Sequence, residues 1–288
     1  MPLPSVSFEF FPPRNLEASF NLFEIVQTLG TYKPRFVSVT YGAGSTTREI
    51  TRDAVATLRK HTGLNVAAHL TCVDATREET LAIADQFAIA GVTEIVALRG
   101  DPPKGASGFV PHPEGFTSSV ELIEALSDDG RFTIRVGAYP EKHPDALDND
   151  ADVDWLKRKL DAGADEAITQ FFFEAETFLR FRDRCAKAGI TSPIIPGILP
   201  IENWKGVRNF ATRCGASIPP ILDDAFTKAA RDDREHLLAT ARATELCSEL
   251  LDEGVDSLHF YTLNKPDLTR DVCHALGIQP EISLQNVA

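Results

Sequence analysis

The sequence of 288 residues is short of basic side chains. It contains 29 Lys and Arg against 42 Asp and Glu, which gives a formal net charge of −13 at pH 7. A chain with this charge repels the phosphate backbone of nucleic acids, so we expect no general nucleic-acid binding. A locally basic pocket that holds a small anion is still compatible with this composition.

Long hydrophobic runs and paired cysteines are also missing. The longest stretch without Asp, Glu, Lys or Arg is Ala188–Ile201, which contains three prolines, whereas a membrane-spanning helix needs roughly 20 apolar residues. The segment Met1–Phe11 lacks the basic and apolar regions of a signal peptide, so we expect none. The five cysteines are widely spaced and form no CxxC motif. Their pattern argues against a disulfide scaffold or a metal site such as zinc, and it favours a reducing cytoplasm.

Short apolar runs rich in β-branched residues predict eight strands along the whole chain. They are Ser5–Phe10, Phe36–Thr40, Asn65–Thr71, Glu94–Arg99, Thr133–Tyr139, Glu166–Phe172, Ile194–Leu199 and Ser257–Leu263. Segments with helical periodicity lie between them, and one begins with a capping box formed by Thr76 and Glu79. These segments are Leu16–Gly30, Thr47–His61, Thr76–Ala90, Thr117–Leu126, Asp152–Ala162, Ala175–Ala188, Glu202–Cys214, Asp223–Glu253 and Leu268–Leu276.

The alternation of strands and helices predicts a parallel sheet. Eight repeats within ~250 residues are typical of a closed (β/α)8 barrel, or TIM barrel, and we expect residues 1–288 to form one such domain. The stretch Asp223–Glu253 then supplies an extra helix before the last strand. An open doubly wound sheet is the alternative, but no G-x-G-x-x-G follows any strand, and Gly42 and Gly44 lack the third glycine.

Polar side chains mark the carboxyl ends of the strands, where active sites of such barrels form. Period-two alternation turns Val6, Phe8 and Phe10 towards the helices and Glu9 into the barrel. A buried carboxylate is costly unless it is paired or used in chemistry. Other polar residues at strand ends are Thr40, His69, Thr71, Arg99, Asp101, Tyr139, Glu141, His143, Gln170, Asn264 and Lys265. Each could be structural by itself, but together they predict acid–base or hydride chemistry on a polar, planar ligand.

Many of these residues lie in short motifs that follow one another in a fixed order. The motifs are Ser7–Arg14, Val37–Ala43, Ala68–Cys72, Leu98–Pro103, Ala138–Pro144, Asp161–Ala164, Ile168–Phe173, Pro196–Pro200 and His259–Asn264. Their order and spacing resemble those of the methylenetetrahydrofolate reductase family, from Phe8 to about Pro280.

This resemblance implies a (β/α)8 flavoenzyme that binds FAD without a dinucleotide-binding fold. Its small-molecule partners would be folate and a nicotinamide dinucleotide, with NADH or NADPH reducing 5,10-methylenetetrahydrofolate to 5-methyltetrahydrofolate. The implied order is ping-pong: the nicotinamide reduces the flavin and leaves, and folate then binds to the same flavin face. The length fits a bacterial catalytic domain, and family members often form homo-oligomers.

The resemblance also implies roles for individual residues. Glu9 matches the general acid that protonates the departing nitrogen when the methylene bridge opens, and we expect its burial to favour the protonated form. Asp101 matches an aspartate that stabilises the cationic iminium, and Gln170 matches the pterin-binding glutamine. The residues that match cofactor contacts are Thr40, His69, Leu98, Arg99, Gly100, Asp101, Phe116, Tyr139, His143, Asp152, Trp155 and Lys159.

The sequence departs from the family pattern at four positions. Trp204 replaces a Phe that stacks on the nicotinamide or folate ring, and Lys265 replaces an Arg that contacts the folate carboxylate. Trp155 stands at a flavin-contacting Asn, and Phe116 stands near a flavin-contacting Tyr. The last two motivate an alternative reaction, direct hydride transfer from NAD(P)H without flavin. A barrel that only binds a pterin or an anion is a further alternative, but it would have no need of Glu9.

Overall fold

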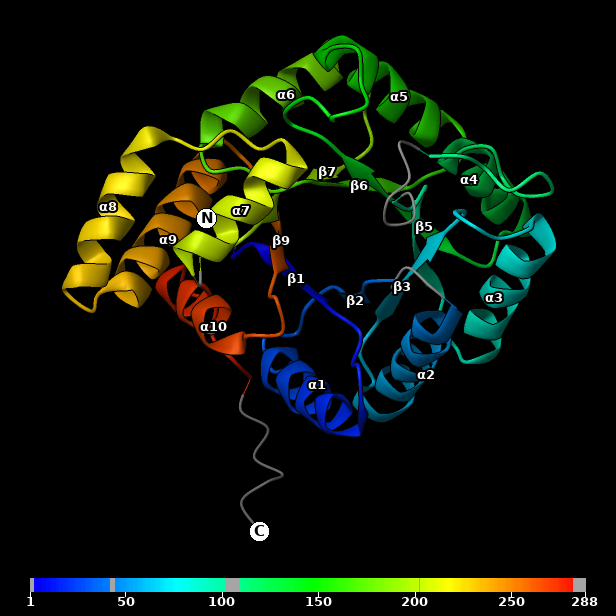
Figure 1. Cartoon of the computed structure of the whole chain (residues 1–288), viewed down its shortest axis with the longest axis horizontal. Coiled ribbons are helices and arrows are strands. Elements are labelled where there is room, and N and C mark those ends of the chain that lie inside the picture. Colours follow the sequence, from blue (N-terminus) through cyan, green and yellow to red (C-terminus); the bar gives the residue numbers. More distant parts are fainter. Residues whose placement is uncertain (1–2, 42–44, 102–108, 202, 282–288) are drawn as a thin grey trace.

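The computed structural model describes residues 3–41, 45–101, 109–201 and 203–281. In this part of the chain the strands are all parallel and form one sheet that curls into a barrel, with helices around it (Figure 1). The strands are β1 (Ser5–Phe10), β2 (Val37–Val39), β3 (Val66–Thr71), β4 (Glu94–Leu98), β5 (Thr133–Ala138), β6 (Glu166–Thr169), β7 (Ile194–Ile195), β8 (Gly197–Ile198) and β9 (Ser257–Tyr261).

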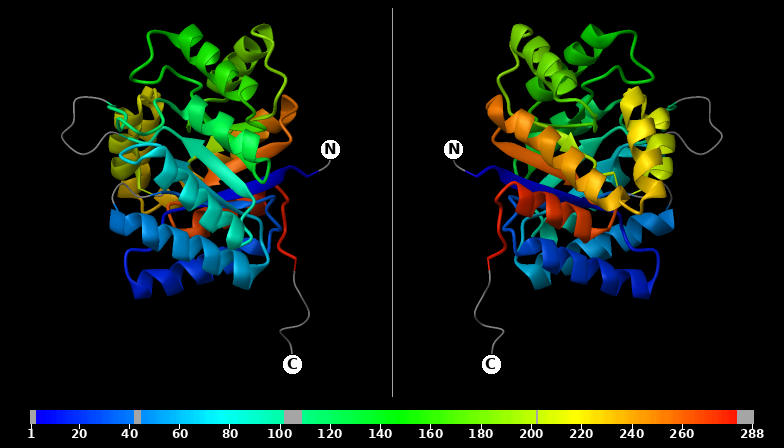
Figure 2. Two further views of the ribbon diagram at one scale, coloured as in Figure 1. Left: turned by 90° about the vertical axis from the view of Figure 1, so that its right-hand side faces the viewer. Right: turned by 90° about the vertical axis from the view of Figure 1, so that its left-hand side faces the viewer.

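The helices cover the outer face of the barrel, as the side views in Figure 2 show. They are α1 (Leu16–Gly30), α2 (Ser45–Thr62), α3 (Arg77–Ile89), α4 (Ser119–Asp129), α5 (Asn149–Asp161), α6 (Ala175–Lys187), α7 (Trp204–Cys214), α8 (Pro220–Arg231), α9 (Glu235–Asp252) and α10 (Pro266–Ala275). The predicted capping box is present at the start of α3, where Thr76 and Glu79 satisfy each other's backbone N–H groups. Glu202, at which we expected α7 to begin, lies outside the described residues.

The seventh strand of the barrel is broken into two short pieces. We predicted one strand over Ile194–Leu199, but Pro196 has no N–H to donate and separates β7 from β8. The first piece pairs with β6 and the second with β9. The two ends of the sheet therefore meet in this segment. The predicted (β/α)8 class is confirmed, and an open doubly wound sheet is excluded.

The long stretch before the last strand contains two helices. We expected extra helix over Asp223–Glu253, and the structure divides it into α8 and α9 at Asp233, whose φ is +54°. In Figure 1, α8 lies at the outer edge of the ring beyond α9. Leu222 and Phe226 bury α8 in a satellite core with α7.

The barrel interior is closed at its amino-terminal end by buried charges. Arg135 of β5 is 4% exposed and forms ion pairs with Glu94 of β4 and Glu166 of β6. Its guanidinium lies 3.7 Å from the centre of the Phe36 ring. Buried charges are tolerated when they are paired and hydrogen-bonded. The amino-terminal end of the barrel interior is therefore filled by side chains, and the open space of the interior lies at its carboxyl end.

A glycine to alanine change should show how tightly the seventh strand closes. A Cβ at Gly197 would lie 2.1 Å from the carbonyl oxygen of Thr169 and 2.6 Å from the Tyr261 ring. We expect Gly197→Ala to lower the free energy of unfolding by about 3 kcal/mol, because backbone and ring cannot both move aside. Gly206→Ala in α7, where the added Cβ would be 3.5 Å from its nearest neighbour, is the control. Equal denaturant midpoints for the two variants would contradict this.

Candidate active site

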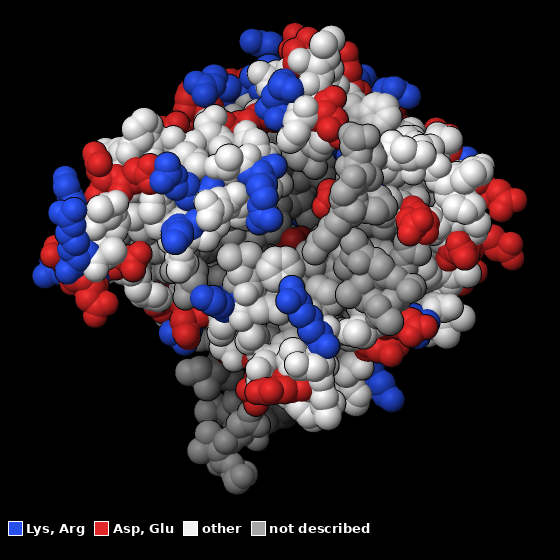
Figure 3. All heavy atoms as spheres, in the orientation of Figure 1, with Lys and Arg blue, Asp and Glu red and all other residues white. Residues whose placement is uncertain are grey.

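A cavity of about 700 Å³ opens at the carboxyl ends of the strands. A second cavity of about 210 Å³ adjoins it and shares several lining residues with it. The shared residues are Glu9, His69, Leu98, Gly137, Ala138, Tyr139 and Gln170. Figure 3 shows a hollow in the centre of this face, with Lys and Arg gathered beside it over α7 and acidic side chains more frequent over α3 and α4.

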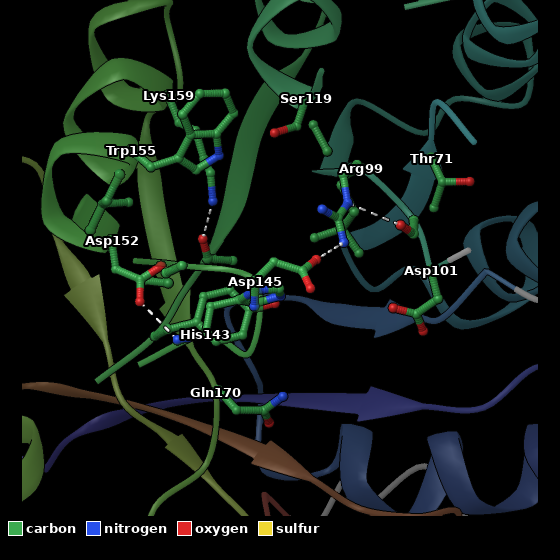
Figure 4. Close-up of a pocket in the computed structure, with 18 of the residues that line it drawn as sticks. Thr71, Arg99, Asp101, Ser119, His143, Asp145, Asp152, Trp155, Lys159 and Gln170 are labelled. Carbon is green, nitrogen blue, oxygen red and sulfur yellow. Dashed lines mark hydrogen bonds and ion pairs between the residues drawn. The ribbon is translucent and has the colours of Figure 1, made fainter. Parts of the chain in front are cut away.

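Most of the residues that the sequence predicted for a site line the larger cavity. They are Glu9, Thr40, His69, Leu98, Arg99, Gly100, Asp101, Tyr139, His143, Asp152, Trp155, Lys159 and Gln170. They come from the carboxyl ends of six strands, β1 to β6, and from α5, and Figure 4 shows many of them directed into the same space. Residues far apart in the sequence are thus brought together by the fold.

Glu9 is the carboxylate at the centre of this site. Its Oε2 lies 3.1 Å from Nε2 of His69 and 3.6 Å from Nε2 of His259, and Ser38 Oγ donates a hydrogen bond to it at 3.3 Å. Burial by itself would raise the pKa of the Glu9 carboxyl. The charge of His69 and the contacts from both imidazoles outweigh burial and lower this pKa to about 2.

The state of Glu9 differs from the one that its burial led us to expect. We expected desolvation to favour the protonated form, but the two histidines favour the carboxylate in the ligand-free protein. At neutral pH the Glu9 carboxyl of the ligand-free protein is therefore ionised. His69, which contacts Oε2, also lines both cavities.

Two cations line the larger cavity, Lys159 from α5 and Arg99 after β4 (Figure 4). Lys159 is buried and its Nζ donates to the carbonyl of Gly137 at 2.7 Å. Desolvation lowers the pKa of this ammonium to about 8. Arg99 pairs with Asp145 at 3.0 Å, and Asp145 is largely exposed. Within the described part of the chain this buried ammonium donates a side-chain hydrogen bond to one carbonyl, and such a cation is suited to an anionic ligand.

The wall formed by the segment after β5 is held by backbone and ring contacts. The backbone N–H of His143 donates to Oδ2 of Asp152 at 2.8 Å, and the rings of Tyr139 and His143 meet edge to face with centres 4.5 Å apart. Burial raises the pKa of Tyr139 to about 12 and lowers that of His143. At neutral pH this wall therefore presents an intact phenol and an uncharged imidazole.

Gly100 brings the backbone to the cavity in a conformation that requires glycine. Its φ is +88°, and a Cβ there would lie 2.5 Å from the Val73 side chain. A side chain at this position would be strained both by the backbone angle and by that contact. Glycine at position 100 therefore lets the backbone line the cavity without this strain.

Three of the predicted residues do not line either cavity. Trp204 is buried between α7 and α8, where its ring stacks on Phe226 and its Nε1 donates to Asp223 at 2.8 Å. Phe116 is fully buried in the core beneath the Arg77 guanidinium. Lys265 is exposed just before α10.

The sequence reasoning missed an aromatic residue of α7 that does line the smaller cavity. Phe210 stacks on Phe171, with ring centres 5.3 Å apart and an interplanar angle of 27°. Helical periodicity could have separated it from Trp204, because the two lie six positions apart and therefore on different faces of α7. It could not have shown which face meets the barrel, since α8 was not distinguished from α9.

Comparison with known proteins gives consistent matches. A family model described as methylenetetrahydrofolate reductase matches residues 3–277. The 5,10-methylenetetrahydrofolate reductases of Salmonella typhimurium and Escherichia coli are each 45% identical to this chain over 277 residues, which cover 96% of this chain and 92% of theirs. That of Pectobacterium carotovorum is 42% identical over 280 residues, covering 97% of this chain and 92% of its own.

Solved structures with low sequence identity share the fold. One is an uncharacterized protein from Clostridium thermocellum that binds two copies of 5-methyl-5,6,7,8-tetrahydrofolic acid, with a TM-score of 0.59 and 15% identity over 96% of this chain and 95% of that one. Another is the dihydropteroate synthase from Xanthomonas albilineans, with a TM-score of 0.52 and 13% identity over 96% and 92% of the two chains.

In the described part of this chain, no helix combines the length and apolar character required to cross a bilayer.

The buried ammonium of Lys159 should make the free energy of unfolding depend on pH. Between about pH 8 and 10.5 the unfolded chain keeps a proton that the folded protein has lost, so stability should rise with pH in this window. We expect Lys159→Met to stabilise the ligand-free protein by about 1 kcal/mol at pH 7, with the gain shrinking towards pH 10.5. Urea unfolding at several pH values measures this, with the more exposed Lys157→Met on the same helix as control. A gain that grows with pH would contradict it.

Proposed function

The chain belongs to the methylenetetrahydrofolate reductase family of oxidoreductases, and from this premise we propose that it reduces 5,10-methylenetetrahydrofolate to 5-methyltetrahydrofolate with NADH or NADPH through bound FAD. The observation that carries the proposal is the convergence of Glu9, Gln170 and the predicted cofactor contacts other than Phe116 on one cavity. The names of the full-length relatives supply the reaction, and the cavity supplies groups suited to it.

The larger cavity fits a planar, doubly charged cofactor. When bound there, FAD supplies a carrier that takes a hydride from the nicotinamide and gives it to the folate. Arg99 and Lys159 would hold its pyrophosphate, because an anion beside the buried ammonium restores the stabilisation that burial removes. Trp155, with the Arg158 guanidinium 4.5 Å from its ring centre, offers an aromatic surface in the same cavity.

The smaller cavity suits the ring of a substrate. Phe171 and Phe210 give it an aromatic wall on which a planar ring can stack. The Oε1 of Gln170 accepts a hydrogen bond from the backbone N–H of Phe171 at 3.1 Å, so its amide NH₂ is left to donate to a ligand. Because the two cavities share a wall, we infer that the nicotinamide leaves before folate enters, as in a ping-pong order.

Glu9 supplies the proton for opening the methylene bridge. As the carbon–nitrogen bond breaks, its electron pair stays on the departing nitrogen, which takes a proton from the Glu9 carboxyl. His69 restores that proton, since it contacts Oε2 and lines the same space. The carboxylate of Asp101, also on the lining, stabilises the iminium cation that forms.

Direct hydride transfer from NAD(P)H to the same substrate, without flavin, is the second candidate. The replacements at positions 116 and 155 motivated it, but Phe116 is packed in the core and does not line the cavity. Only Trp155 remains as a departure within the cavity. An indole there removes a polar contact but keeps a surface on which a ring can stack, so it favours the FAD reaction.

An absorption spectrum of the purified protein distinguishes the two reactions. With FAD bound, we expect a flavin band that NADH bleaches under anaerobic conditions and that methylenetetrahydrofolate then restores. These two changes report the two half-reactions and their order. A colourless protein that oxidises NADH only when folate is present, without added FAD, would overturn the proposal in favour of direct transfer.

Replacing Glu9 separates the two half-reactions. Glu9→Gln keeps the size of the side chain but cannot donate an acidic proton, so we expect folate reduction to fall by ~100- to 10,000-fold. Reduction of the flavin by NADH needs no such proton and should be largely spared. Stopped-flow absorbance measures both, and Glu245→Gln on the exposed face of α9 is the control. Wild-type rates in both half-reactions would show that Glu9 is not the acid.

A further inference from the structure

A second histidine lies behind Glu9 and touches neither cavity. His259 of β9 is fully buried, and its ring stacks on Phe36 with centres 5.6 Å apart. On its other side, the ring of Tyr261 meets it edge-on at 5.2 Å. The parallel pairing of β1 and β9 sets Ser7 directly opposite His259. The imidazole is thus fixed in place by packing, out of reach of any ligand in the cavities.

The hydroxyl of Ser7 determines which nitrogen of His259 carries hydrogen. Ser7 Oγ lies 2.8 Å from Nδ1, whereas its other acceptor, the carbonyl of Leu258, is at 3.5 Å. The hydroxyl therefore donates best to Nδ1, which leaves the hydrogen of the neutral ring on Nε2. Burial lowers the pKa of His259, and this favours the neutral ring. A neutral ring with hydrogen on Nε2 results, and among the described residues that N–H has no partner within hydrogen-bond distance.

Buried N–H groups without a partner are costly, so this one needs an explanation. The carboxylate oxygen Oε2 of Glu9 lies 3.6 Å away, slightly beyond hydrogen-bond distance. Catalytic hydrogen bonds in ligand-free proteins are often long and shorten when substrate binds. The position of His259 is therefore that of a donor held ready behind the acid.

The contacts of Glu9 are all on one oxygen. Ser38, His69 and His259 approach Oε2, while Oε1 has no hydrogen bond or ion pair with any described residue. We propose that His259 is a positioning residue for the reaction: held by Ser7, it anchors Oε2 of Glu9 and leaves Oε1 as the oxygen that delivers the proton. This inference rests on the proposed function, in which Glu9 is the acid.

Other charged or titratable groups face this pair from the neighbouring strands. They are His69 from β3, Arg135 and Tyr139 from β5 and its end, and Tyr261 from β9. Arg135 is neutralised by its ion pairs with Glu94 and Glu166. Burial raises the pKa of both tyrosines, so they stay protonated at neutral pH. The ionisation of Glu9 is therefore governed mainly by His69 and His259.

Variants of His259 test the proposal through the titration of Glu9. In His259→Leu the Glu9 carboxylate loses a hydrogen-bond donor but stays buried, so we expect the pKa of Glu9 to rise by about one unit or more. Carbon-13 NMR of the ligand-free protein with labelled Glu measures the titration of the Glu9 carboxyl, whose signal is assigned as the one that is missing in Glu9→Gln. The fall in the rate of folate reduction with rising pH should move to higher pH by the same amount.

Three further variants separate positioning from folding. His259→Gln, which retains an N–H group, should restore much of the wild-type titration. Ser7→Ala keeps the ring but frees its tautomer, so it should give a smaller upward shift than His259→Leu. His274→Leu is the matched control, because its imidazole also bonds a hydroxyl, that of Tyr32 at 2.6 Å, but lies on α10 outside the barrel. It should leave the titration of Glu9 unchanged.

The outcome that would overturn the inference is a folded His259→Leu or Ser7→Ala protein in which Glu9 titrates as in the wild type. The NMR titration requires no activity, so it is independent of the proposed reaction. A wild-type protein that fails to reduce methylenetetrahydrofolate would instead refute the proposed function, whatever the titration shows.

Discussion

The closure of the barrel at its seventh strand is the constraint on which the site depends. Pro196 interrupts the strand, and Gly197 lets the backbone approach the carbonyl of Thr169, which also accepts a hydrogen bond from the Tyr261 hydroxyl at 2.6 Å. This junction fixes β9 beside β1, and the register of that pair puts His259 opposite Ser7 and next to Glu9. The geometry around Glu9 therefore follows from the contact of the Gly197 segment with the other side of β9.

The two ends of the barrel interior differ in how completely their buried charges are paired. At the amino-terminal end, Arg135 is matched by Glu94 and Glu166, and the cluster is complete in itself. At the carboxyl end, His69, His259 and Ser38 all approach the same oxygen of Glu9, and the hydrogen bond that the structure gives Lys159 among the described residues is to a carbonyl. Complete pairing makes buried charges tolerable within a fold, whereas incomplete pairing leaves polar groups to be satisfied by a ligand. This difference places the incompletely paired polar groups at the end of the barrel that carries the cavity.

Much of the fold could be predicted because its signals are local. Apolar runs and helical periodicity predicted every strand segment of the barrel and most helix limits within a few residues. The break at Pro196 was missed because Ile194–Leu199 forms one apolar run around the proline, and the division of Asp223–Glu253 was missed although the junction between its two helices is a run of charged residues, 231–235. The packing of α8 against α7 was missed because it is a contact between separate elements, so Trp204 was assigned to the site although it lies between these helices.

The sequence by itself determined the alternation of strands and helices, the inward direction of Glu9 and the set of polar residues at the strand ends, because these depend on residue type and on the period of two. The tertiary structure decided which of these residues meet. It placed Phe210 on the cavity instead of Trp204, and it brought His69 and His259 to one oxygen of Glu9. It also reversed the expected ionisation of that carboxyl, since a pKa depends on neighbours in space, and these neighbours lie 60 and 250 positions away in the chain.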